Sequence, residues 1–277
     1  MAHMEKPMFS IVIPALNEET FLPLLLTSLS EQTDKDFEVI VVDGQSEDKT
    51  IAVAKKFTET LPHLTVVTSP VRCLPDQRNY GASLAHGEWF IFSDADNIFL
   101  PYAIAQMKRY ITTHKKEKPK LIASWCQADS ELVSDSLIAL FSNMVTEGSL
   151  SVKHQFTPGP LTIVKRSVFE TIGGYTNGLR WGEDMDFGDK MQKAGVRLSI
   201  IREVLYVWSM RRLRSEGKIK FAQQAVRAAL HMLLTNKALT KGYEMGGQLY
   251  KKKKTVNVSV MKRLTVDIKK LLEEVFE

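Results

Sequence analysis

Residues 88–97 read Glu88-Trp89-Phe90-Ile91-Phe92-Ser93-Asp94-Ala95-Asp96-Asn97, a short apolar run that ends in two acids separated by one small residue. The aromatic and β-branched side chains predict a buried strand, and the acids follow where that strand leaves the sheet. Open α/β sheets bind their ligands at this edge. Paired carboxylates there suit Mg²⁺ or Mn²⁺ carrying a diphosphate, whereas a D-x-D pair alone is also typical of helix caps and solvated loops.

Strands and helices alternate on both sides of this stretch. Nearly continuous apolar runs predict strands over residues 9–14, 37–42, 64–68 and 121–125. Helix-start signals and apolar periodicity predict helices that open at residues 17–20, begin near residues 48–50, span 76–85, and run from Pro101 to about His114. This alternation predicts an α/β fold with a doubly wound, mostly parallel sheet.

The pattern changes beyond residue 127. Here the sequence predicts a helix over 134–148, a loop leading into a strand that ends at 164, a short helix over 166–172, a helix that closes near Gly195, and a late strand over 198–208. We therefore expect residues 8–127 and 128–215 to form two halves of one domain. Residues 216–277 are expected to form a helical, basic extension, with an apolar face over 218–239 and consecutive lysines at 251–254.

Composition argues against several classes of protein. The chain has 277 residues and two cysteines, Cys73 and Cys126, which lie far apart without a Cys/His cluster, so we expect neither a disulfide framework nor a structural zinc site. No secretory leader is recognised after residues 1–4, and no apolar run approaches the ~20 residues of a membrane span. The formal charge of +5 is concentrated late in the chain, which suits phosphate groups or an anionic surface better than duplex DNA. We expect a cytoplasmic protein that does not bind nucleic acid.

Three acids are expected at the same edge of the sheet. Asp43 ends the second strand, and Asp94 and Asp96 follow the fourth. The turn after the first strand lacks the G-x-G-x-x-G pattern of dinucleotide-binding turns, and no P-loop sequence occurs. Asp43 alone could be a helix cap. Repelling carboxylates gathered at one edge are better explained by a divalent cation and a polar ligand between them, with Asp43 accepting hydrogen bonds from a base or ribose.

Six motifs follow one another along the chain, up to about residue 210. They are Ile11-Val12-Ile13-Pro14-Ala15-Leu16-Asn17-Glu18-Glu19, Val41-Val42-Asp43-Gly44-Gln45-Ser46, Gln77-Arg78-Asn79-Tyr80-Gly81-Ala82, Asp94-Ala95-Asp96, Gly173-Gly174-Tyr175 and Gly182-Glu183-Asp184-Met185-Asp186. In this order they resemble the motifs of family 2 inverting glycosyltransferases of GT-A fold. The resemblance implies a nucleotide-sugar-binding half over 8–127, an acceptor-binding and catalytic half over 128–215, and a divalent metal, Mg²⁺ or Mn²⁺.

The resemblance also implies roles for single residues. Asp184, in the Glu183-Asp184 pair, would deprotonate the acceptor hydroxyl. Asp96 would hold the metal, with Asp94 at the ribose or as a second metal ligand. The remaining donor contacts would come from Pro14, Ala15 and Glu18 beside the base and ribose, from Asp43 at the base, and from Arg78 near the base or phosphates.

The Glu183-Asp184 pair also has a structural interpretation. Acids in the first turn of a helix interact favourably with the helix dipole, whatever their chemistry. The dipole would favour the charged form of Asp184, and burial beside a substrate would oppose it.

One position departs from the family pattern. Family members often carry a histidine shortly after the late strand, as a further metal ligand, where this chain reads Tyr206-Val207-Trp208-Ser209-Met210-Arg211-Arg212. A third protein ligand is therefore in doubt. The sequence instead favours Arg211 and Arg212 as groups that neutralise a phosphate, because guanidinium binds phosphate in bidentate fashion, with a solvated basic loop as an equal alternative.

The sequence thus predicts a metal-dependent, inverting glycosyltransferase with UDP as the favoured donor nucleotide and a sugar or lipid-linked acceptor. One alternative is an inactive nucleotide-sugar-binding scaffold, which would be expected to have lost an acid. The other is a nucleotidyltransferase, which would need a glycine-rich basic turn where this chain has Ala15-Leu16-Asn17-Glu18. Peripheral contact with the inner face of a membrane, packing on the domain and a homodimer are open roles for the extension.

Overall fold

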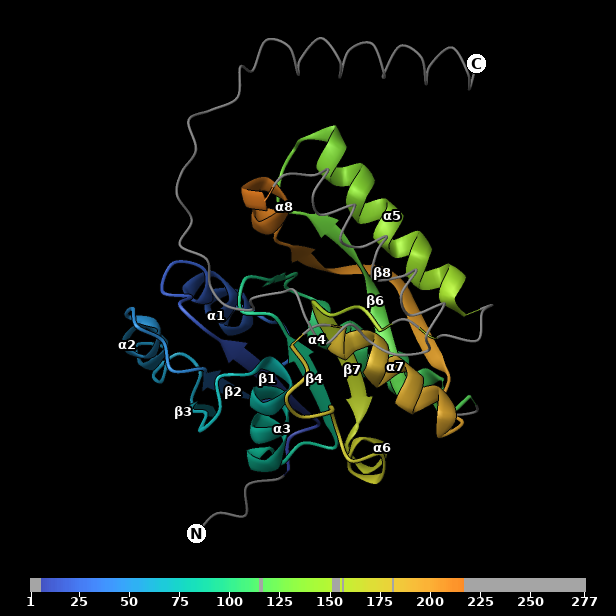
Figure 1. Ribbon diagram of the computed structural model, residues 1–277, viewed down its shortest axis with the longest axis horizontal. Coiled ribbons are helices and arrows are strands. Elements are labelled where there is room, and N and C mark those ends of the chain that lie inside the picture. The colour runs from blue at the N-terminus through green and yellow to red at the C-terminus, as the bar shows by residue number, and fades with distance from the viewer. Residues whose placement is uncertain (1–5, 115–116, 151–154, 156, 181, 217–277) are drawn as a thin grey trace.

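The computed structural model describes residues 6–114, 117–150, 155, 157–180 and 182–216 (Figure 1). Its elements, in chain order, are β1 (Phe9–Ala15), α1 (Leu22–Ser30), β2 (Phe37–Asp43), α2 (Thr50–Lys55), β3 (Leu64–Thr68), α3 (Leu74–Leu84), β4 (Trp89–Ser93), β5 (Ile98–Phe99), α4 (Ala103–Thr113), β6 (Leu121–Ala128), α5 (Val133–Ser149), β7 (Leu161–Lys165), α6 (Arg166–Thr171), α7 (Glu183–Lys193), β8 (Leu198–Trp208) and α8 (Arg211–Glu216).

The described strands form one sheet in the order β3-β2-β1-β4-β7-β6-β8-β5. Strands β3, β2, β1 and β4 are parallel neighbours, and so are β6 and β8. Strand β7 lies antiparallel between β4 and β6, and β5 pairs antiparallel with β8. The predicted α/β fold with a mostly parallel sheet is confirmed, and β7 is the element that joins the parallel first half to the second half.

Alternate residues of the central strands feed two hydrophobic cores, one on each face of the sheet. Ile11 and Ile13 of β1 pack in a core with residues of α1 and α4. Val12, between them, packs in the opposite core with Phe169 of α6 and Phe187 of α7. Because both faces are covered, the central strands read as continuous apolar runs rather than alternating ones.

The first helix begins later than the sequence predicts, so that prediction is wrong at its start. Residues 17–20 form a turn instead of opening α1, and Asn17 has a left-handed backbone with φ 56°. The Asn17 amide donates to Ser46 Oγ at 2.9 Å, and the Glu18 amide donates to Thr50 Oγ1 at 2.8 Å. These bonds tie the first β-α turn to the second one, and the helix can start only after them.

Two short elements have no counterpart in the sequence-based prediction. Strand β5 has two residues, too few for periodicity to show. The basic run after β8 is not a solvated loop, because it forms α8 and buries Leu213 in the core. Except for its first residue, the expected extension over 216–277 lies outside the described residues, including the helix predicted over 218–239. None of the helices in the described ranges is both long and apolar enough to cross a membrane.

Candidate active site

Adjacent strand ends bring the first group of predicted residues together. Ala15 and Asp43 are partners in the parallel register of β1 and β2. Strand β4 lies on the other side of β1, and Asp94 follows its last residue. Pro14, Ala15, Asp43 and Asp94 therefore lie along the carboxyl ends of three neighbouring parallel strands, the edge at which such sheets bind ligands.

Asp43 is held in one orientation but is not fully satisfied. Its side chain is buried, and its Oδ2 atom accepts hydrogen bonds from the backbone amides of Gln45 and Ser46 at 3.0 and 3.1 Å. Its Oδ1 atom is buried and has no hydrogen-bond partner within the described ranges. A buried acceptor without a partner is costly, so this oxygen suits a donor group on a ligand.

Arg78 connects the two halves of the domain. Its side chain is 1% exposed, and its guanidinium bonds to Asp184 Oδ1 at 3.1 Å and to Asp94 Oδ1 at 3.3 Å. The same group donates to the carbonyl of Gly159 at 3.0 Å and lies 3.7 Å from Glu183 Oε1. One buried cation therefore fixes the acids after β4 relative to the acids at the start of α7.

The loop before β7 contacts both groups of acids. The carbonyl of Pro160 accepts from the Asp94 amide at 3.1 Å and from Asn97 Nδ2 at 2.5 Å. The hydroxyl of Thr157 donates to the carbonyl of Asp184 at 2.5 Å. The loop over 157–160 therefore helps Arg78 to fix the position of Asp94 relative to Asp184.

Arg211 forms ion pairs with Glu18 and Asp96, two acids that the resemblance places near the donor. It forms a bidentate pair with Glu18, and its Nε atom is 2.7 Å from Asp96 Oδ2. Its guanidinium also lies 4.4 Å from the centre of the Phe21 ring. The predicted alternative of a solvated arginine is wrong for Arg211, because α8 packs back against the sheet. Arg212 is half-buried. Burial raises the pKa of Glu183, and the charges of Arg78 and, to a smaller extent, Arg212 offset part of that rise.

Burial gives these carboxyl groups unusual titration behaviour. It raises the pKa of Asp94 and of Glu18 to about 7 in each case, and the attraction of Arg78 and Arg211 compensates only in part. Burial and the neighbouring Glu183 carboxylate raise the pKa of Asp184 to about 7 as well. Of the two opposing effects predicted for Asp184, burial therefore outweighs the helix dipole.

The donor set fits a divalent cation. Asp94 and Asp96 offer hard carboxylate oxygens, and together with Glu18, Glu183 and Asp184 they outnumber Arg78 and Arg211, the two arginines that pair with them, five to two. The described residues contain no group of three His, Cys, Asp or Glu side chains suited to a metal. Mg²⁺ and Mn²⁺ do not need one, because Mg²⁺ in particular is bound by one or two carboxylates together with phosphate oxygens and water.

No role was predicted for Gly159, which shapes the space around Asp184. Gly159 lies against the acid so closely that a Cβ atom there would be 2.2 Å from Asp184 Oδ2. The only signal of this contact was the Pro158-Gly159-Pro160 sequence, which indicates a turn without saying what it touches.

Replacing Gly159 with alanine is expected to lower turnover by about 10- to 100-fold, because the added methyl must displace the Asp184 carboxylate and small misplacements of reacting groups are costly. The measurement is the rate of nucleotide-sugar cleavage together with UDP affinity, which should change little. Gly148→Ala is the matched control, since a Cβ there meets nothing within 4 Å. Equal rates for the two variants would contradict the prediction.

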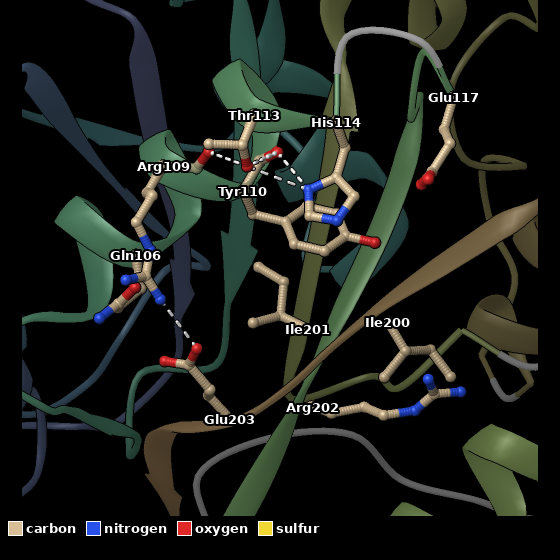
Figure 2. A pocket seen from close by; sticks show the side chains of 10 residues that line it. All are labelled: Gln106, Arg109, Tyr110, Thr113, His114, Glu117, Ile200, Ile201, Arg202 and Glu203. Atoms are coloured by element: carbon tan, nitrogen blue, oxygen red, sulfur yellow. Dashed lines mark hydrogen bonds and ion pairs between the residues drawn. The ribbon is translucent and has the colours of Figure 1, made fainter.

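A separate groove of about 650 Å³ lies between α4 and β8 (Figure 2). It contains none of the predicted site residues. The rings of Tyr110 and His114 stack with centroids 4.1 Å apart, and Arg109 pairs with Glu203 at 3.0 Å. Arg202 is paired with Glu147 at 2.9 Å. Because these charges are already matched, the groove offers a ligand much less than the acid-rich site does.

Comparison with known proteins agrees with the geometry. A family model described as glycosyl transferase family 2 matches residues 10–173. Similar sequences include an uncharacterized glycosyltransferase of Haemophilus influenzae, 27% identical over 65% of this chain and 60% of its own length. A PGL/p-HBAD biosynthesis glycosyltransferase of Mycobacterium bovis is 30% identical over 66% of this chain and 69% of its own length. This chain thus covers less than two thirds of the length of the first relative and slightly more than two thirds of the length of the second.

Solved structures of similar fold bind nucleotides or nucleotide sugars. The mannosyltransferase PcManGT of Pyrobaculum calidifontis, solved with GDP-Man and Mn²⁺, aligns with a TM-score of 0.59 at 21% identity over 81% of this chain and 65% of its own. Residues 1–349 of TarS of S. aureus, solved with UDP, align with a TM-score of 0.57 at 20% identity over 73% of this chain and 60% of that fragment. At these identities the likeness supports the fold alone, which is of GT-A type.

Proposed function

The chain belongs to glycosyl transferase family 2, and from this membership we propose that it moves a sugar from a nucleoside-diphosphate sugar to an acceptor hydroxyl or lipid phosphate, with inversion at the anomeric carbon. UDP is the donor nucleotide that we favour. TarS has been solved with UDP and UDP-GlcNAc, whereas PcManGT was solved with GDP-Man. The choice of uracil as the nucleobase of the donor is therefore part of the proposal.

One observation carries this proposal: buried Arg78 joins Asp94, on the expected donor side, to Asp184, on the expected acceptor side. Sugar transfer with inversion needs a base beside the acceptor and positive charge beside the leaving diphosphate. The Arg78 guanidinium contacts both the acid assigned to the donor side and the acid assigned to the acceptor side. A nucleotide-binding scaffold without activity would not need an acid held by Arg78 on the acceptor side, where Asp184 lies.

On the donor side, we assign the predicted residues by the groups that they expose. The unpaired oxygen of Asp43 would accept from the base, beside Pro14, Ala15 and Glu18. Asp94 would contact the ribose, and Asp96, with Asp94, would hold Mg²⁺ or Mn²⁺. Arg211 and Arg212 would neutralise phosphate oxygens, which requires Arg211 to exchange its contacts with Glu18 and Asp96 for the ligand.

On the acceptor side, Asp184 would take the proton from the acceptor oxygen while that oxygen bonds to the anomeric carbon and the bond from this carbon to the diphosphate breaks. Arg78 would keep the Asp184 carboxylate in place, and the neighbouring Glu183 would help to raise its pKa to about 7, which makes it a better base. When bound, the metal ion would act as a Lewis acid on the diphosphate, so that no protein acid is required there. We keep the division into a donor half over 8–127 and an acceptor half over 128–215 as part of this proposal, with Arg211 and Arg212 reaching the donor phosphates from the second half.

Some predictions fall outside this assignment. Contact with a membrane and formation of a homodimer were predicted from the extension, and cytoplasmic location from the lack of targeting signals. They stay predictions.

A thermal-shift panel tests the proposed donor. Nucleoside diphosphates that bind the native state should raise the unfolding midpoint by mass action, and the shift should be larger with Mn²⁺ than with EDTA. We expect UDP to give the largest shift. A chain whose midpoint responds to no nucleoside diphosphate, with or without Mn²⁺, would not fit a nucleotide-sugar enzyme.

Turnover is expected to rise with pH and to level off above about pH 7. Asp184 can act as a base only when deprotonated, and burial raises its pKa to about 7. Asp184 therefore loses the blocking proton as the pH rises through about 7. The rate of donor cleavage should be measured across this range alongside UDP affinity, because Asp94 and Glu18 titrate near the same pH and affect binding. A flat or falling rate at constant UDP occupancy would exclude Asp184 as the base.

A further inference from the structure

Helix α5 presents an apolar stripe to solvent. Large apolar side chains recur on it at helical spacing and are all exposed: Leu137, Leu140, Phe141, Met144 and Val145. Leu132 and Leu150, just beyond its two ends, are exposed as well. Phe141 is the extreme case, with 67% of its surface accessible. A contiguous apolar surface of this kind on a folded domain marks a place where something else binds.

The inward face of α5 has few large apolar residues, which is unusual for a helix at the surface of a domain. The residues that it buries fully are small or polar, namely Asp135, Ala139, Thr146 and Ser149, and Ile138 is a partly buried apolar residue that it packs against the core. Amphipathic helices normally turn their apolar side inward. Since α5 turns its larger apolar side outward, its sequence suits a helix covered on both sides.

The surroundings of the stripe are acidic. A groove of about 580 Å³ borders it, with Leu140 on one wall and Asp129 and Glu131 among the other lining residues. Helix α5 itself carries Asp135 and Glu147 and no lysine or arginine. The arginines nearby, Arg202 and Arg214, pair with three of these four acids, so two positive charges face four negative ones and the surface keeps a net negative charge. The stripe therefore suits an occupant that is apolar on one side and basic on the other.

The described chain ends beside this stripe. Arg214 of α8 bonds to Asp129 at 2.6 Å and lies 3.5 Å from Asp135 in the first turn of α5, and Figure 1 shows α8 next to that end of the helix. The following residues, 217–243, contain five lysines and arginines and no aspartate or glutamate. Within them, Phe221, Val226, Ala229, Leu230 and Leu233 recur at the spacing of one helix face.

We propose that residues 218–239 pack as a helix along the apolar stripe of α5. At 1.5 Å per residue such a helix would be about 33 Å long, and α5 is about 25 Å long, so the segment can cover the whole stripe. It would start at the end of α5 to which α8 is tied. A tether this short gives the segment a high effective concentration, so no separate partner has to be recruited. The packed helix would also hold α8, and with it Arg211, in place.

Two other occupants fit less well. An anionic membrane would be repelled by the acids that flank the stripe, whereas helices that lie on membranes carry lysine and arginine on their polar face. In a symmetric pair of α5 helices from two copies, antiparallel packing would bring the Glu131 end of one helix to the Glu147 end of the other, so like charges would meet. The basic segment of the same chain meets neither objection.

Photo-crosslinking in the full chain tests the proposal. Phe141 is replaced by p-benzoylphenylalanine, the protein is irradiated at low micromolar concentration, and the adduct is identified by mass spectrometry of tryptic peptides. We expect an adduct of monomer mass that joins the α5 peptide to a peptide from 218–239. The same probe at Leu137, one turn earlier and also exposed, should give the same adduct. Leu24 is the matched control, since it is 51% exposed on α1, close to the 53% of Leu137, and should give none.

Substitutions in the segment complete the test. With the probe at Phe141, Val226→Asp/Leu233→Asp should lower the adduct yield at least tenfold, because both positions lie on the proposed contact face. Gln224→Asp/His231→Asp adds the same acids at the same spacing on the opposite face and should leave the yield unchanged. An adduct of dimer mass, an adduct with lipid when phosphatidylglycerol vesicles are present, or no adduct at either probe position would overturn the proposal.

Discussion

Replacing Asp184 with asparagine is expected to lower turnover by at least about 10²-fold and to leave the affinity for UDP nearly unchanged. Asparagine keeps the shape of the side chain and an oxygen that can accept from Arg78, which lies 3.1 Å from Asp184. It cannot take a proton from the acceptor. The rate of metal-dependent nucleotide-sugar cleavage and calorimetry with UDP give the two quantities.

Asp186→Asn is the matched control for this experiment. Asp186 lies in the same first turn of α7 and accepts a hydrogen bond from Thr176 at 2.6 Å, away from Arg78. If acids of this turn served only to stabilise the helix through its dipole, the two substitutions would have similar effects. A near-parental rate for Asp184→Asn would show that another group is the base.

Replacing Asp96 with alanine is expected to weaken UDP binding in Mn²⁺ by at least about 10-fold, because it removes a carboxylate ligand from a hard cation that needs oxygen donors. The loss should be specific to the metal-bound complex. In EDTA the parent chain and the variant should bind UDP with similar, low affinity, which calorimetry can measure directly.

A carboxylate that pairs with arginine elsewhere provides the control. Glu203 pairs with Arg109 at 3.0 Å in the groove between α4 and β8, so Glu203→Ala removes an arginine-paired carboxylate, here a more exposed one, without touching the site. It should leave Mn²⁺-dependent UDP binding unchanged. If Asp96→Ala bound UDP as tightly as the parent chain in Mn²⁺, the metal prediction would be wrong, and the contact of Asp96 with Arg211 would be its main role.

The order of the strands and helices could be predicted from the sequence because its signals are local. Continuous apolar runs correctly predicted β2, β3, β4 and β8, and Gly173 and Gly174 marked the end of α6. The rule that parallel strands present their carboxyl ends at one edge was enough to expect Asp43 and Asp94 on the same side of the sheet. The turn at residues 17–20 was mispredicted because its hydrogen-bond partners, Ser46 and Thr50, lie in a different β-α unit.

The chain by itself thus determined its β-α units, the edge of the sheet where the acids gather and the family to which it belongs. Only the tertiary structure decided which charges meet: Arg78 and Asp184 are 106 residues apart, and Arg211 and Glu18 are 193 apart. Such pairs depend on how helices pack over the sheet, and no periodicity encodes that. The same packing partly buries Asp94 and Asp184 and raises their pKa values to about 7, so the protonation of the site follows from the folded chain.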